Sequence, residues 1–152
     1  MKKFLSFCLL LTLGGCAIPS SGNSYQLYYV NEYSSTGQAL QSVVRYLPED
    51  QEEIDIKTLV EAHLEYGIPD DVQSPFPSGT TVLRGEVLEN GLAEVTFSSE
   101  YGELSGIEKT VADFAVFHTI IQLPRVNAVQ IHVQGEEEEP PVLKEGAGVF
   151  ME

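Results

Sequence analysis

The placement of the cysteines constrains the fold of this chain more than any other feature of its sequence. Both of them, Cys8 and Cys16, lie within the first 16 of 152 residues. The rest of the chain therefore has no thiol for a disulfide, a thiolate metal site or nucleophilic attack. It must be held together by an apolar core, and a chain of this length buries about two thirds of its unfolded surface, which is enough for one domain.

Residues 1–15 have the organisation of a signal peptide. Residues 1–3 (MKK) are positively charged, and residues 4–13 form an apolar run that is too short for a permanent membrane span. The run ends in Leu13-Gly14-Gly15-Cys16, which resembles the lipobox of bacterial lipoproteins. The resemblance implies cleavage before Cys16, a diacylglyceryl group on its sulfur, and stable anchoring to the cell membrane by two or more acyl chains. An ordinary secretory signal with an incidental cysteine is the alternative.

The charge of the chain excludes one class of partner. There are 23 acidic and 8 basic residues, a net charge of −15, and loss of residues 1–15 with their two lysines gives −17. Nucleic-acid binding needs clustered Lys and Arg, so a nucleic-acid partner is excluded. An anionic bilayer surface would also repel this domain. The expected membrane contact is therefore the lipid, with residues 16–24 as a lipidated, flexible tether.

The apolar pattern predicts one α+β domain over residues 25–135, in which an antiparallel or mixed sheet of four or five strands packs against two helices on one face. Strands are expected at residues 25–30, 38–47, 80–88, 92–98 and 126–133, and helices from Asp55 to about Gly67 and over residues 107–123. Residues 38–47 lack clean alternation, so a helix is the alternative there. Residues 136–152 form an acidic tail, from which Val142-Leu143 or Val149-Phe150 could return to a sheet edge.

Two of these elements predict which side chains are buried. In the hairpin around Asn90-Gly91, residues at every second position should face the core: Ala93, Val95 and Phe97. In the second helix, an apolar stripe recurs at three- and four-residue steps: Ile107, Val111, Phe114, His118 and Ile121. Toward the C-terminal end, Val116, Phe117 and Ile120 widen this stripe. That width predicts a largely buried helix.

The sequence contains no local signature of an esterase, a zinc protease or a nucleotide hydrolase, and no cofactor or metal motif. His63, between two glutamates, is expected at the helix surface or partly packed. His118 is expected in the core or at its edge, and His132 is expected to point from a strand into solvent. Glu136–Glu139 lacks the spacing of a calcium loop and predicts a solvated segment. We therefore assign no catalytic or metal-binding residue, and the only assigned site is lipid attachment at Cys16.

Tyrosines are the remaining candidates for a binding surface, because each combines a large apolar ring with a polar tip. Six could be exposed, and half of these are expected at the edge of the core: Tyr28, Tyr29, Tyr33, Tyr46, Tyr66 and Tyr101. One sequence does not separate the two groups, so no binding residue is assigned.

Four elements in order resemble the GerMN domain of sporulation and germination lipoproteins. They are Pro77-Ser78-Gly79-Thr80, the turn Asn90-Gly91 followed by Ala93-Glu94-Val95, a helix ending near Thr119, and a strand from Pro124-Arg125-Val126 to Gly135. A weaker likeness includes residues 25–29 and 40–48. The resemblance implies an extracytoplasmic binding domain, similar to the ring-building domains of the sporulation channel, with no catalytic residues. Only one such domain is present, where the family's sporulation protein resembles two in tandem.

Three hypotheses follow. The first is a membrane-anchored, non-catalytic interaction module that binds sporulation-channel or other cell-envelope proteins. The second is a solute- or glycan-binding lipoprotein, for which a concave aromatic pocket and a longer chain would be expected. The third is a small hydrolase built around His118 or His132. The first hypothesis accounts best for the signal, the acidic charge and the absence of catalytic motifs.

Overall fold

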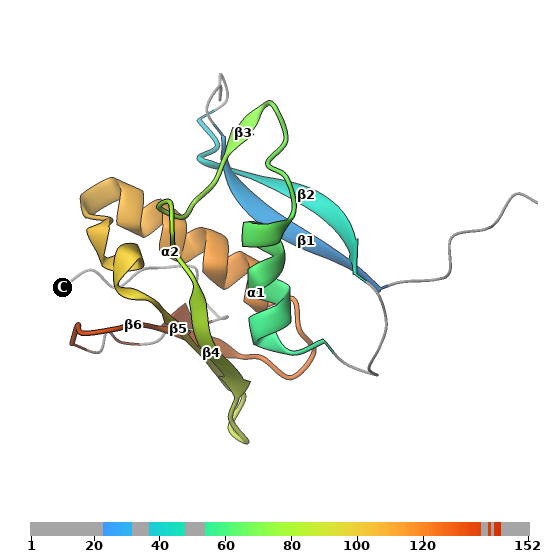
Figure 1. The fold of residues 1–152 in the computed structure, drawn as a ribbon. Coiled ribbons are helices and arrows are strands. Elements are labelled where there is room, and N and C mark those ends of the chain that lie inside the picture. The colour runs from blue at the N-terminus through green and yellow to red at the C-terminus, as the bar shows by residue number, and fades with distance from the viewer. Residues whose placement is uncertain (1–22, 32–36, 48–53, 138–139, 141, 144–152) are drawn as a thin grey trace, which may run out of the picture.

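The structure, a computed structural model, describes residues 23–31, 37–47, 54–137, 140 and 142–143. The predicted α+β class is confirmed (Figure 1). The elements, in chain order, are β1 (Asn23–Asn31), β2 (Leu40–Leu47), α1 (Ile56–Glu65), β3 (Val72–Gln73), β4 (Val82–Val87), β5 (Leu92–Phe97), the 3-10 helix η1 (Ser99–Glu103), α2 (Gly106–Ile120), β6 (Ala128–Val133) and β7 (Val142–Leu143). Residues 40–47 are a strand rather than a helix, and the short strand β3 was not predicted from the sequence.

The strands form two sheets instead of the single sheet expected from the sequence. Their orders are β2-β1-β3 and β4-β5-β6-β7, and β5 and β6 run parallel while the other neighbours are antiparallel. Side chains at the end of α2 and just after it bind part of the edge of β1. The Gln122 side chain accepts a hydrogen bond from the Gln26 N–H at 2.9 Å and donates one to the Gln26 carbonyl at 2.8 Å. The Gln26 N–H and carbonyl therefore already have hydrogen-bond partners and are not available to pair with a further strand.

Both helices pack between the two sheets (Figure 1). Helix α1 packs on β4 and α2 packs on β1, and the helices also contact each other. The sequence predicted two helices on one face of a single sheet. In the structure, the two helices form a layer between two sheets. The core continues through this middle layer, so the apolar faces of both sheets are covered.

The hairpin follows its sequence pattern. Ala93, Val95 and Phe97 are fully buried, as predicted. Gly91 has a φ of +83°, which suits glycine at the predicted turn, and the Asn127 N–H donates to its carbonyl at 2.8 Å. This bond joins the turn to the start of β6. In β6, Val129 is buried and Ile131 and Val133 pack on the core.

Helix α1 begins where its capping residue predicts. The Asp55 carboxylate accepts hydrogen bonds from the Thr58 N–H at 2.9 Å and from the Thr58 hydroxyl at 2.7 Å. The first turn of α1 lies directly against Gly85 of β4, where an added Cβ would come within 2.8 Å of the Lys57 nitrogen. The close contact between helix and sheet therefore depends on the missing side chain.

We expect Gly85→Ala to lower the free energy of unfolding by about 1–3 kcal/mol, because the added methyl group must push α1 away from β4. Gly67→Ala is the matched control, since an added Cβ there meets no atom within 4 Å. Urea denaturation of the two variants measures the difference. Equal stability of the two variants would show that α1 does not need this close contact.

Candidate functional site

The prediction that α2 is largely buried holds for only one of its sides. Ile107 is 82% exposed, and Val111, Phe114 and His118 are only half-buried. The buried face of α2 lies to one side of this stripe and includes the predicted Val116, Phe117 and Ile120. The fold therefore buries one of two apolar surfaces of the helix and leaves the other one exposed.

The exposed stripe forms the floor of a groove. One hollow of about 490 Å³ is lined by residues 73–77, by η1 and by Leu104 and Ile107 of the η1–α2 corner. A second hollow of about 280 Å³ is lined by residues 38–40 and by Phe114. Val111 lines both hollows, so they adjoin along α2. We call this surface the α2 groove.

The α2 groove combines an apolar floor with an acidic rim. The apolar lining comprises Val30, Ala39, Leu40, Pro75, Phe76, Pro77, Leu104, Ile107, Val111 and Phe114. Of the residues that line the two hollows, the charged ones are Glu103 and Glu108, and both are exposed. This chemistry suits binding of an apolar, positively flanked surface.

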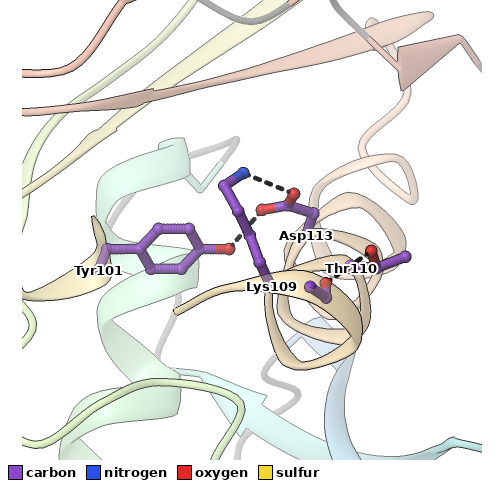
Figure 2. Close-up of polar contacts among 5 residues, drawn as sticks. Tyr101, Lys109, Thr110 and Asp113 are labelled. Atoms are coloured by element: carbon purple, nitrogen blue, oxygen red, sulfur yellow. Dashed lines mark hydrogen bonds and ion pairs between the residues drawn. The ribbon is translucent and has the colours of Figure 1, made fainter. Parts of the chain in front are cut away.

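Polar contacts fix the corner between η1 and α2, next to the groove (Figure 2). The buried Tyr101 ring stacks on Phe97 at 4.5 Å, and its hydroxyl donates to Asp113 Oδ1 at 2.8 Å. Lys109 Nζ donates to Asp113 Oδ2 at 2.9 Å, so this cation is engaged with its own helix. The first turns of α2 are therefore held against the core, and the groove is preformed.

We expect Tyr101→Phe to lower the free energy of unfolding by roughly 1.5 kcal/mol, because the charged Asp113 carboxylate loses the hydrogen bond that the Tyr101 hydroxyl donates to it. Tyr28→Phe is the matched control: its hydroxyl donates to Gln26 Oε1 at an exposed position. Thermal unfolding of both variants gives the comparison. A larger loss for Tyr28→Phe would contradict the anchoring of α2 by Tyr101.

His63 was expected at the surface or partly packed, and this prediction is wrong. Its side chain is 2% exposed, its Nε2 shares a hydrogen bond of 2.8 Å with Thr119 Oγ1, and its ring lies 5.0 Å from Tyr29 and 5.4 Å from Phe76. The neighbouring glutamates pointed to a surface position, but residue 63 follows Leu59 and Val60 on the buried face of α1. Burial lowers the pKa of His63 to about 3. The imidazole is therefore a neutral part of the core.

The other two histidines lie outside any shared site. His118 is at the edge of the core, as predicted, with its ring 5.1 Å from Tyr28 and 5.3 Å from Phe117. Burial lowers its pKa. His132 is half-buried on β6, where full exposure to solvent was expected. Within the described ranges, no group of three or more His, Cys, Asp or Glu side chains could hold a metal ion.

The candidate tyrosines divide between core and surface. Tyr29 and Tyr101 are fully buried, so neither can contribute to a binding surface. Tyr28 is half-buried, while Tyr46 and Tyr66 are exposed. Tyr33 lies outside the described residues, as do Cys16, most of the tether and Val149-Phe150. Val142-Leu143 forms β7 at the edge of β6.

In the part of the chain that the structure describes, no helix is both long and apolar enough to cross a membrane.

The comparison with protein families decides the family of this chain. The model of the Germane family, described as sporulation and spore germination, matches residues 26–139. The chain belongs to the Germane family. Its GerMN-like motifs therefore mark a true family relationship, and the family is described by a cellular process rather than by an enzymatic reaction.

Solved structures share the Germane fold. The first GerMN domain of the sporulation protein GerM from Bacillus subtilis has a TM-score of 0.61 and 19% sequence identity, and the match covers 76% of this chain and 85% of that domain. The tandem GerMN domains of the same protein give a TM-score of 0.59 at 20% identity, over 77% of this chain and 41% of that one. A candidate lipoprotein from Clostridium perfringens gives 0.51 at 18% identity, over 81% and 88%. No curated protein sequence matches the chain.

Proposed function

We propose that this Germane-family protein is an extracytoplasmic lipoprotein that acts without catalysis, by binding another protein of the cell envelope. The process is sporulation, germination or another envelope assembly. The observation that carries the proposal is the α2 groove, a preformed apolar surface that the described residues of the domain leave open. Apolar surface of this kind on a folded domain marks interaction sites, since burying it against a partner is favourable.

The N-terminal sequence supports the anchor. An apolar run that ends in Leu13-Gly14-Gly15-Cys16 is typical of a lipoprotein signal, and lipid on Cys16 would hold an acidic domain close to a membrane that its charge alone would not bind. The structural likeness to a candidate lipoprotein from Clostridium perfringens agrees with this assignment. The tether then lets the groove reach partners in the envelope.

Membrane fractionation combined with mild crosslinking and affinity purification tests the proposal. The wild-type chain is expected in the membrane fraction together with one or more envelope proteins, in growing or in sporulating cells. Cys16→Ala is expected to leave the membrane fraction and to lose most of that partner, because anchoring supplies a high effective concentration. Recovery of wall fragments or small solutes in place of a protein would contradict the proposal and favour a solute- or glycan-binding role.

A further inference from the structure

We propose that the α2 groove binds an amphipathic helix of the partner protein, with Lys or Arg residues flanking the apolar face of that helix. The inference rests on the proposed function and specifies the chemistry of the partner. In this complex, the exposed stripe of α2 contacts the apolar face of the partner helix. Glu103 and Glu108 at the rim pair with its Lys or Arg residues.

The shape of the surface favours a helix as the occupant. Ile107, Val111 and Phe114 follow one another at four- and three-residue steps along α2. Side chains at this spacing form a ridge parallel to the helix axis, and a second helix can lie beside such a ridge. Residues 73–77 wall the groove near Ile107, and residues 38–40 wall it near Phe114. The groove therefore follows the helix axis over about two turns.

The charge of the surface selects a basic partner. The rim residues Glu103 and Glu108 are exposed, and the nearby Lys109 is already paired with Asp113. The chain as a whole carries a net charge of −15. A second copy of this chain, or any acidic segment, would meet like charges at the groove. A helix flanked by Lys or Arg would gain from both glutamates and from the overall field, which raises the association rate.

The groove is also rigid enough to bind without large rearrangement. Phe76 is buried in the wall, with its ring 5.4 Å from His63 and 5.6 Å from Phe97. Pro75 and Pro77 restrict the backbone on either side of it. Helix α2, which forms the floor of the groove, is held in place by the hydrogen bond between Tyr101 and Asp113. Preformed walls reduce the ordering cost of binding.

Site-specific photo-crosslinking in cells identifies what covers the groove. A benzophenone amino acid replaces Ile107 in the lipidated, full-length chain, and the same residue replaces Tyr46 as the control. Tyr46 is 73% exposed and lies on β2, about 20 Å along the strand from Leu40 at the groove. We expect position 107 to crosslink to a segment with apolar residues at three- and four-residue steps and flanking Lys or Arg. We expect at least tenfold less of this product at position 46.

Several results would overturn the inference and leave the proposed function intact. Crosslinks of one partner at position 46 but not at 107, or a crosslinked segment that is acidic or extended, would show that the partner binds elsewhere or by another chemistry. Crosslinks at 107 to a second copy of this chain or to lipid would do the same. Failure of the proposed function looks different, because then neither position crosslinks to an envelope protein.

The crosslinked segment, made as a synthetic peptide, tests the role of the rim. We expect the double variant Glu103→Lys/Glu108→Lys to bind it at least tenfold more weakly than the wild type at low salt, with a smaller loss of affinity as salt is added. The control Asp70→Lys/Asp71→Lys reverses two charges on an exposed turn outside the groove lining. If both double variants lowered the affinity for the peptide equally, the net charge of the chain would explain the effect. That result would contradict specific recognition by Glu103 and Glu108.

Discussion

The free energy of unfolding is expected to fall by about 2 kcal/mol between pH 7 and pH 5, because His63 is buried as a neutral imidazole. Its pKa is about 3 in the folded protein, against an ordinary value of 6.5. The unfolded chain therefore binds a proton at pH 5 that the folded chain does not bind. The stabilisation is complete above pH 6.5 and decreases as the pH falls through the window between 6.5 and 3.

The surroundings of His63 explain why the folded protein resists protonation. Nε2 is already bonded to Thr119 Oγ1, and Nδ1 is buried with no hydrogen-bond partner among the described residues. The nearest rings are those of Tyr29 and Phe76, which offer no compensating negative charge. A charged imidazolium there would lose its hydration and gain nothing in return.

Urea denaturation at pH 5, 6, 7 and 8 measures this effect. His63→Leu, which keeps an apolar side chain in the core, is expected to remove most of the change between pH 7 and pH 5. His118→Gln is the control, since His118 is only half-buried and should account for a smaller part of it. A His63→Leu variant with the same pH dependence as the wild type would show that another group is responsible.

Thr119→Val is expected to lower the free energy of unfolding by roughly 2–4 kcal/mol, although valine has nearly the same shape as threonine. The Thr119 hydroxyl oxygen joins three elements: it shares a hydrogen bond with His63 of α1 and accepts one from the Tyr28 N–H of β1 at 3.3 Å. Valine would leave both groups without this partner inside the protein. The loss exceeds that of one hydrogen bond because one buried and one partly buried polar group remain unsatisfied.

Thr110→Val on the same helix is the matched control for Thr119→Val. The Thr110 hydroxyl donates to the Gly106 carbonyl at an exposed position, so its removal should change stability by less than about 0.5 kcal/mol. Thermal and urea unfolding of the two variants give the comparison. Similar small effects for both substitutions would show that Thr119 does not connect α1, α2 and β1.

Local signals in the sequence predicted most of the elements. The Asp55 cap, the Asn90-Gly91 turn and the alternation of Ala93, Val95 and Phe97 each act within a few residues, so the chain segment alone reveals them. The separation into two sheets involves contacts between residues far apart in sequence, such as the binding of Gln122 to the Gln26 backbone. No local pattern encodes such a contact.

The residues of α2 that line the groove were recognised in the sequence as an apolar stripe, but they were assigned to the core. Val116, Phe117 and Ile120 are buried as predicted, but Ile107, Val111 and Phe114 were expected to be buried as well. The buried face also carries Thr119, which binds the β1 backbone directly. A helix whose apolar residues occupy more than one side is the signal that would have identified the exposed surface.

Recovery of the crosslinked envelope partner with Ile107→Asp tests the central claim most directly. This variant changes a single exposed side chain and keeps Cys16, so its anchoring and thermal stability should match those of the wild type. We predict at least a tenfold loss of the partner with Ile107→Asp, and no loss with Tyr46→Ser, whose side chain is exposed away from the groove. Full recovery of the partner with Ile107→Asp would contradict binding through the α2 groove.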